Sequence, residues 1–447
     1  MAHAALGEVA LLLLAWLLSE DRWRVPWRTV IAGVLLQLAL AFLLLGFPPA
    51  VAVVMLANRA AHALQRASEA GTGFVFGYLG GGPLPFTETS PGASFILAFK
   101  ALPLVLVISA LASLLFYWGV MQRVTGAFAW VLRRWMGIGG ALALGAAVHV
   151  FVGMVEAPLL VRPYLARMQR GELFALMTCG MAGVAGTVMV IYAGFLAPLI
   201  PDALGHILIA SVVSTPAGLA VAALMVPFRP AVVARRGAVV RVTAEWGDAE
   251  RVTVEARADV AAANAADEGQ LVLQDPPVSS IDALVKGTAD GIPVLVGIVA
   301  TLVVTIAMVT LVNTAFGLLP HLGGEALTLQ RMFSWLFRPV MWLIGVPWQE
   351  VGAASVLMGT KTVLNEFVAY LNFATMPVDA FTPRTRLILT YALCGFANFG
   401  SAGIMVGGIG IMIPDRRAEV VQLGMRSIIS GTLATCMSGA LAGAIAG

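Results

Sequence analysis

A series of long apolar runs constrains this chain more than any other feature of its sequence. A helix needs about 20 mostly apolar residues to span about 30 Å of hydrocarbon. Charged residues make up only 11% of the chain, whereas soluble domains have about 25%. The sequence therefore predicts an all-α polytopic membrane protein with eight transmembrane helices, near residues 5–20, 29–47, 97–120, 173–198, 205–227, 292–318, 387–413 and 424–446.

Other apolar stretches do not have the pattern of a continuous span. Segments 139–165 and 348–373 are long but carry polar residues near their middles, so each is predicted to form a re-entrant hairpin. Segment 48–68 has polar residues at helical spacing, which is typical of an interfacial helix. Segment 324–347 is apolar and aromatic with two arginines, and is expected to lie flat on the other surface.

The arginines indicate an orientation. Arginine clusters follow the first, third and fifth predicted spans and precede the eighth. Because Lys and Arg concentrate in cytosolic loops, eight crossings with both termini outside place all four clusters in the cytosol. Arg384 and Arg386 are the exception to this scheme. The first span has no basic segment before it, so it is predicted to be a retained helix and not a cleaved signal.

The remaining composition argues against several other functions. A net charge of +3, with Lys and Arg dispersed among apolar runs, does not indicate a nucleic-acid partner. The three cysteines lie in apolar segments and the five histidines are scattered, so no metal site or disulfide framework is expected. No cofactor motif or nucleophile–base pair stands out, and 359–361 lacks the glycine spacing of a phosphate loop. The chain is therefore not expected to be an enzyme.

The sequence also contains an internal repeat. A broken apolar segment with Glu156 precedes LMTCGMAGVAG (176–186), and a second one with Glu366 precedes YALCGFANFGSAG (391–403). Three predicted crossings separate equivalent points, and an odd number inverts the second half in the membrane. Inverted repeats with discontinuous helices are typical of secondary transporters, whose binding sites lie near the midplane.

Four polar residues in these repeats are candidates for the binding site. A carboxylate at membrane depth costs at least about 2.5 kcal/mol on insertion scales, so Glu156 and Glu366 need a reason to be there. Either they share a central site, or Glu366 merely pairs with Lys361 and Glu156 with Arg162. The glycines near Asn398 and Ser401 fit a broken helix or close helix packing, but a buried amide needs partners.

Several long segments carry a specific resemblance. They are AWLLSEDRWRVPWR (15–28), ALPLVLVISALASLLFYWGVMQ (101–122), VEAPLLVRPYLARM (155–168), GTKTVLNEFVAYL (359–371), YALCGFANFGSAGI (391–404) and RSIISGTLATCMSGALAG (426–443). Over most of its length the chain resembles the concentrative nucleoside transporter family. The resemblance implies nucleoside uptake by symport with a cation, proton or sodium. It also implies a homotrimer of independently working protomers in a bacterial inner membrane.

The sequence predicts an organisation in four parts. Residues 1–96 would form scaffold helices and the interfacial helix, and 97–227 the first repeat with its hairpin. The charged segment 228–285 would be a cytosolic loop, with a short hairpin around 238–255. Residues 286–447 would form the second repeat with its hairpin. In the family, a scaffold surrounds a mobile transport domain built from the hairpins and broken helices.

The resemblance also assigns substrate contacts. Glu366, Asn398 and Ser401 fall where the family contacts the ribose hydroxyls, and Glu156 falls where it contacts the edge of the base. Val188 and Phe396 fall on the apolar walls of the base pocket. The family's usual GQTE is Gly153-Met154-Val155-Glu156 here. Met154 and Val155 therefore replace two polar side chains that read the base.

The implied cation site departs from the family pattern as well. The family's sodium-binding asparagine, seven residues before the glutamate, is His149 here, and Gly183 occupies the position of a hydroxyl residue, with Thr187 the nearest hydroxyl. Val152 and Val184 complete this candidate site. An unperturbed histidine titrates at about pH 6.5, so His149 is either the carrier of a coupling proton or a hydrogen-bonded structural residue. Two other functions remain open: transport of another ribosyl or heterocyclic metabolite, and a non-transporting membrane sensor.

Overall fold

The computed structural model describes residues 2–88, 94–154, 156–228, 242–243, 253–254, 277–321, 324 and 326–445. These residues are almost entirely helical. Five helical segments are long and apolar enough to cross a membrane: Trp27–Gly46, Leu97–Tyr117, Ala203–Met225, Ser280–Phe316 and Pro414–Ile445. The predicted helical membrane fold is thus confirmed. Two-residue strands, β1 (Val242–Thr243) and β2 (Thr253–Val254), pair antiparallel in the segment where the sequence analysis places a hairpin.

The N-terminal third contains seven helical elements. They are α1 (Ala2–Leu17), α2 (Trp27–Gly46), α3 (Pro48–Phe76), the short 3-10 helix η1 (Gly77–Gly80), α4 (Leu97–Lys100), α5 (Leu104–Tyr117) and α6 (Val120–Met136). The segment predicted as an interfacial helix over 48–68 continues as α3 to Phe76. The amphipathic helix α6 was not predicted, although its arginines alternate with apolar residues at helical spacing.

The two predicted repeats contain the same sequence of helices. The first has α7 (Gly140–Val148), α8 (Glu156–Leu160), α9 (Arg162–Leu165), α10 (Arg170–Ala182), α11 (Gly186–Leu196) and α12 (Ala203–Met225). The second has α16 (Trp348–Val363), α17 (Glu366–Thr375), α18 (Pro383–Leu393), α19 (Phe399–Met412) and α20 (Arg417–Ile445), with short 3-10 turns η2 (Val378–Ala380) and η3 (Pro414–Arg416). Each repeat thus has helices over the segment of its predicted hairpin, then a helix in two halves and a long final helix.

Local residue chemistry explains where the helices break in the second repeat. Asn365 precedes α17, and its side-chain Oδ1 accepts a hydrogen bond from the Val368 amide at 2.9 Å. Asn398 precedes α19 in the same way and accepts from the Ser401 amide at 2.7 Å. An asparagine side chain that binds a free amide of the first turn favours the start of a new helix. Asn398 thus explains why the predicted span 387–413 is divided into two helices, α18 and α19. The predicted span 173–198 is also divided, into α10 and α11.

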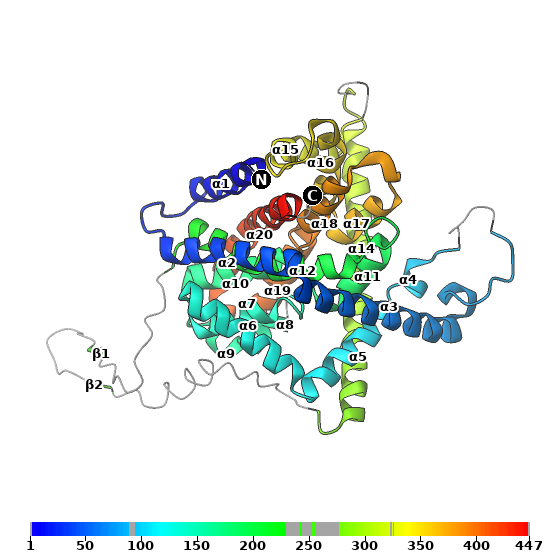
Figure 1. Cartoon of the computed structure of the whole chain (residues 1–447), viewed down its shortest axis with the longest axis horizontal. Coiled ribbons are helices and arrows are strands. Elements are labelled where there is room, and N and C mark those ends of the chain that lie inside the picture. The colour runs from blue at the N-terminus through cyan, green and yellow to red at the C-terminus, as the bar shows by residue number, and fades with distance from the viewer. Residues whose placement is uncertain are drawn as a thin grey trace.

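Helix α14 (Ser280–Phe316) is much longer than a membrane span. Its 37 residues extend about 55 Å at about 1.5 Å per residue. It begins before the predicted span at 292 and overlaps the end of the expected loop 228–285. It runs along one side of the molecule in Figure 1 and packs closely against α5, where a side chain at Gly287 would lie 2.6 Å from the Ser109 carbonyl. Helix α15 (Leu329–Leu343) follows it and lies within the segment expected on the membrane surface.

Helix α20 lies at the centre of the helical packing. It packs against α1, α2, α10, α12, α18 and α19, and Figure 1 shows it running between them. Pairs of hydroxyl groups join it to its neighbours. The Ser438 hydroxyl lies 2.8 Å from the Ser214 hydroxyl of α12, and the Ser430 hydroxyl lies 2.7 Å from the Thr178 hydroxyl of α10. Because α20 contacts both repeats, it fixes the position of the two broken helices relative to each other.

A network of charges joins three helix ends on the side predicted to be cytosolic. Glu20, between α1 and α2, accepts hydrogen bonds from Arg170 at 3.0 and 3.2 Å and is also paired with Arg426. Arg170 begins α10, and it also lies 3.6 Å from Glu419 of α20. The hydrogen bonds from Arg170 hold the pKa of Glu20 below its ordinary value.

This network predicts a small, pH-dependent contribution to stability. Glu20→Gln should destabilise the protein by no more than about 1 kcal/mol at pH 7, because the partners are about one-third exposed. A carboxylate whose pKa is lowered by folding stabilises the folded protein at pH values above its pKa in the unfolded chain, about 4.3. This stabilisation is lost as the pH falls. The thermal midpoints of the unmodified protein and of Glu20→Gln, measured in detergent, should therefore differ less at pH 4 than at pH 7. Asp21→Asn is the matched control, and an equal difference at both pH values would contradict the assignment.

Candidate functional site

The breaks of the two discontinuous helices touch each other at the centre of the molecule. The Phe396 amide donates a hydrogen bond to the Gly183 carbonyl at 3.2 Å. A side chain at Gly395 would lie only 2.6 Å from the Met181 carbonyl, so the close approach requires a glycine. The glycine-rich segments that the sequence analysis singled out are thus the points where the two repeats meet.

Glu366 lies beside this crossing. It is the first residue of α17, and its side chain is only 4% exposed. One carboxylate oxygen accepts a hydrogen bond from the Tyr192 hydroxyl at 2.8 Å, and the other accepts from the Asn398 side-chain amide at 2.8 Å. Asn398 in turn binds the Ser401 amide. The structure therefore brings together Glu366, Asn398 and Ser401, which the sequence analysis assigned to the same part of the site.

Tyr192 was missed by the sequence analysis. It lies on α11 and is 1% exposed, with its ring stacked near those of Phe367 and Tyr370. The available signal was a tyrosine in the middle of the mostly apolar helix GTVMVIYAGFL after the first break. Sequence spacing alone does not show that this hydroxyl reaches a carboxylate 174 positions away.

The simple ion-pair alternatives do not describe the two glutamates. Lys361 is fully buried, but its ammonium donates to the Ala392 carbonyl at 2.8 Å and to the Thr435 hydroxyl at 3.2 Å. Within the described part of the chain, neither Glu366 nor Glu156 forms an ion pair. The carboxylate of Glu366 is instead held by neutral donors.

Glu156, in the segment predicted as the first hairpin, lies in a different environment. Glu156 begins α8 and is exposed, and its carboxylate folds back over Gly153, where a side chain would lie 2.2 Å from its Oε2. Met154 is 9% exposed, and its Cβ lies 3.2 Å from the position that a side chain at Gly180 would take. Met154 thus packs towards α10. Val155 and the side chain of Thr187 lie outside the described residues.

His149 lies against the end of α10. It is 4% exposed, and a side chain at Gly180 would lie 3.1 Å from its Cε1. Among the described residues neither ring nitrogen has a hydrogen-bond partner. The next turn is anchored to the start of α11, because the Gly186 amide donates to the Phe151 carbonyl at 3.1 Å. The turn after His149, with half-buried Val152, therefore adjoins the break of the first discontinuous helix.

The break in the first discontinuous helix exposes unpaired backbone oxygens inside the protein. Helix α10 ends at Ala182, and no described group donates to the carbonyls of residues 179–182. The Val184 amide lies 3.5 Å from the Ser211 hydroxyl of α12, and a side chain at Gly183 would lie 3.8 Å from that hydroxyl. Ser211 was not predicted, because it comes from a different helix. It supplies a hydroxyl near the position where Gly183 lacks one.

Val188 and Phe396 are also near the two breaks. Val188 is 6% exposed in the first turn of α11, and Phe396 is half-buried within the second break. Val188 lies one helical turn before Tyr192 on α11, and Phe396 lies two residues before Asn398. The region thus combines hydrogen-bonding groups with apolar surface, which is typical of small-molecule sites.

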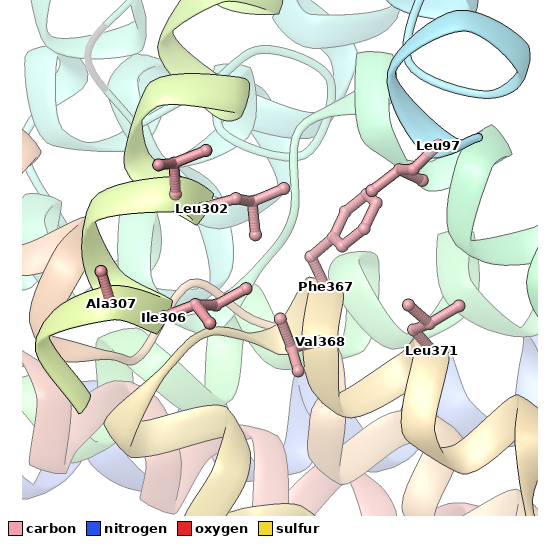
Figure 2. A pocket seen from close by; sticks show the side chains of 8 residues that line it. Leu97, Leu302, Ile306, Ala307, Phe367, Val368 and Leu371 are labelled. Atoms are coloured by element: carbon pink, nitrogen blue, oxygen red, sulfur yellow. The ribbon is translucent and has the colours of Figure 1, made fainter. Parts of the chain in front are cut away.

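A separate cavity of about 490 Å³ adjoins the residues that follow Glu366 in α17. Figure 2 shows that Leu302 and Ile306 of α14 face Phe367, Val368 and Leu371 of α17 across it, with Leu97 of α4 at its edge. Its lining is wholly apolar. Helix α17 is therefore loosely packed against α14 immediately after the buried carboxylate. In the described residues no group of three or more His, Cys, Asp or Glu side chains could hold a metal ion.

Comparison with known proteins identifies the family. Family models match residues 6–79 (Na+ dependent nucleoside transporter N-terminus), 98–199 (nucleoside recognition) and 206–443 (Na+ dependent nucleoside transporter C-terminus). The chain is 35% identical to an uncharacterized transporter of Haemophilus influenzae over 99% of this chain and 97% of that one. It is 32% identical to the putative nucleoside permease NupX of Escherichia coli, over 99% and 98%.

A solved structure agrees with these matches. The transporter CNTnw in an inward-facing, substrate-bound state superimposes with a TM-score of 0.82 and 33% identity, covering 99% of this chain and 97% of that one. The agreement extends over both repeats and the N-terminal helices. The chain therefore belongs to the concentrative nucleoside transporter family, which consists of membrane transporters and not enzymes.

Proposed function

We propose that this protein takes up nucleosides across a bacterial inner membrane by symport with a cation. The observation that carries the proposal is the buried carboxylate of Glu366, held by Tyr192 and Asn398 where two broken helices cross. A carboxylate and an amide side by side suit the two hydroxyls of a ribose, because each can exchange hydrogen bonds with a diol. The positive ends of α17 and α19 also converge on this point.

The proposed topology has eight transmembrane helices and two re-entrant hairpins. Helices α7 and α8 would form the first hairpin, and α16 and α17 the second. Non-helical backbone at membrane depth is tolerated where it lines a cavity, which is the place of both hairpin tips in this proposal. The protomers would assemble as a homotrimer, in line with the family resemblance.

The nucleoside would lie with its ribose on Glu366, Asn398 and Ser401. Its base would lie between Val188 and Phe396, with the exposed carboxylate of Glu156 at the edge of the base. Met154 and Val155 would border the base without offering strong hydrogen bonds. The packing of Met154 towards Gly180 supports this assignment, because it leaves an apolar group where the family has a polar one.

The proposed cation site lies between His149, Val152, Gly183 and Val184. The unpaired carbonyls at the end of α10 make it electronegative, and Ser211 adds a hydroxyl. The family models are described as sodium-dependent. In this chain, however, a histidine with two unpartnered ring nitrogens replaces an oxygen ligand. A neutral imidazole accepts a proton directly, so we assign the proton as the coupling ion.

The apolar border of the base pocket predicts relaxed selectivity. Purine and pyrimidine nucleosides should compete within about tenfold of each other, because an apolar wall leaves no buried polar group unpaired with the wrong base. Free bases should compete poorly, since they lack the ribose. Combining Met154→Gln with Val155→Thr should sharpen the preference among nucleosides.

This prediction is tested by measuring how nucleosides and free bases inhibit uptake of radiolabelled uridine. Cells that lack their own nucleoside transporters are used, so the same assay tests the proposed function. Asp379→Asn, an exposed change on η2, is the control variant. A preference above about a hundredfold for one nucleoside in the unmodified protein would contradict the relaxed pocket. Absence of nucleoside-specific uptake, with the protein present in the membrane, would contradict the function and favour another ribosyl metabolite or a sensor.

A further inference from the structure

Lys361 is a fully buried cation that has no part in the proposed transport site. It lies in the last turn of α16, three residues before the second hairpin breaks. Its ammonium donates to the Ala392 carbonyl at 2.8 Å and to the Thr435 hydroxyl of α20 at 3.2 Å. A buried ammonium is costly unless its protons are well paired, so its placement on a helix-end carbonyl needs an explanation.

The contact completes the capping of α18. The last four carbonyls of any helix lack partners within the helix. Here the Tyr370 hydroxyl binds the Thr390 carbonyl at 2.7 Å, and the amides of Cys394 and Gly395 bind the carbonyls of Tyr391 and Leu393. Lys361 binds the remaining carbonyl, that of Ala392. The carbonyls at the negative end of α18 therefore all have donors, and one of these donors is a buried ammonium group.

The equivalent end of α10 in the first repeat is different. The carbonyls of residues 179–182 have no donor among the described residues, and no lysine lies in α7. His149 at the tip of the first hairpin is the nearest counterpart, and its ring nitrogens are unpartnered. The two repeats thus contain the same junction, a hairpin tip against the end of a half-helix. One junction is open, and the other is filled by an ammonium group.

We propose that Lys361 is a built-in cation that occupies, in the second repeat, the position that the coupling cation occupies reversibly in the first. The comparison with the first repeat rests on the proposed function. The ammonium also balances the charge of Glu366, the buried carboxylate of the same hairpin, without contacting it. Lys361 is a positioning residue that joins the second hairpin to α18 and α20, so this junction does not open when the coupling cation leaves. One repeat then responds to the cation while the other stays assembled.

Chemical rescue tests this assignment. In Lys361→Ala the side chain is removed and the carbonyl of Ala392 loses its cation. Uridine uptake by membrane vesicles should fall at least about tenfold, because a buried acceptor is left unpaired. Adding methylammonium or ethylammonium to the purified variant should raise its thermal midpoint by about 5 °C or more, saturably, because a ligand of the folded state stabilises it. Melting is the readout for the amines, because permeant amines dissipate the pH gradient that drives uptake. A merely structural loss of packing would not respond to a small cation.

Two further variants make the test decisive. Ser355→Ala changes a buried residue of the same helix whose hydroxyl has no hydrogen-bond partner among the described residues, and it should show no amine response. Lys361→Met fills the space without the charge, and it should lose uptake without an amine effect on its thermal midpoint. The proposal is overturned if amines do not raise the thermal midpoint of Lys361→Ala, or, should that variant not reach the membrane, if Lys361→Met transports like the unmodified protein. The amine effect on the thermal midpoint needs no nucleoside, so failure of the proposed function is distinguished from failure of this inference.

Discussion

Replacing Glu366 with glutamine is expected to weaken nucleoside binding by about 10- to 150-fold. The lost charge-assisted hydrogen bonds correspond to about 1.5–3 kcal/mol. Glutamine has only one acceptor oxygen, whereas the carboxylate accepts from both Tyr192 and Asn398. Its amide group must face one of these donors, so the variant disturbs the preformed site as well as the ribose contact. Equilibrium binding of radiolabelled uridine to the purified protein measures the effect directly.

Tyr192→Phe separates the loss of the ribose contact from the disturbance of the preformed site. It removes one hydrogen bond to Glu366 and leaves the charge, so it should weaken binding by less than Glu366→Gln does. Asp379→Asn lies on an exposed turn and should bind like the unmodified protein. Unchanged uridine affinity in a well-folded Glu366→Gln protein would show that the carboxylate does not bind the ribose.

Replacing His149 with asparagine is expected to change the coupling ion. The asparagine side chain adds a carbonyl oxygen beside the open end of α10 and removes the group that accepts a proton. Hard oxygen ligands suit sodium, so uptake by His149→Asn should become dependent on sodium and lose its response to an imposed pH gradient. Initial uptake rates at fixed pH, measured across sodium concentrations, give the result.

His149→Ala is the matched comparison, because it removes the imidazole without adding an oxygen. It should abolish gradient-driven uptake by either ion while uridine binding persists. Strict, saturable sodium dependence of the unmodified protein at fixed pH would contradict the proton assignment. It would indicate that backbone carbonyls and Ser211 complete a sodium site without the asparagine of the family.

The sequence predicted the helical membrane fold and the residues that gather around Glu366. Apolar run length fixes helical spans because backbone groups in lipid must be paired within the segment. Asn398 and Ser401 were identifiable because glycine and a buried amide in an apolar helix are costly without a purpose. The helix break that they predict is present in the structure.

Contacts between distant helices were not predictable in the same way. Tyr192 and Ser211 lie on α11 and α12 and look like ordinary hydroxyl residues in apolar helices. Lys361 appeared to be a partner for Glu366 because they are close in sequence, but the end of α18 lies nearer to its ammonium. Helix α6 was missed because its arginines were used only to assign loop orientation. In each case the outcome depends on which helix ends meet in space.

Uptake by proteoliposomes with imposed ion gradients tests the central claim most directly. Purified protein is reconstituted, and accumulation of radiolabelled uridine is followed with an inward proton gradient, an inward sodium gradient or neither. Coupling to one proton predicts accumulation of up to about tenfold above equilibrium for each pH unit, since a tenfold concentration ratio corresponds to about 1.4 kcal/mol. Dissipation of the gradient should abolish it, and Glu366→Gln should not accumulate uridine. Simple equilibration of uridine under both gradients would contradict cation-coupled nucleoside uptake.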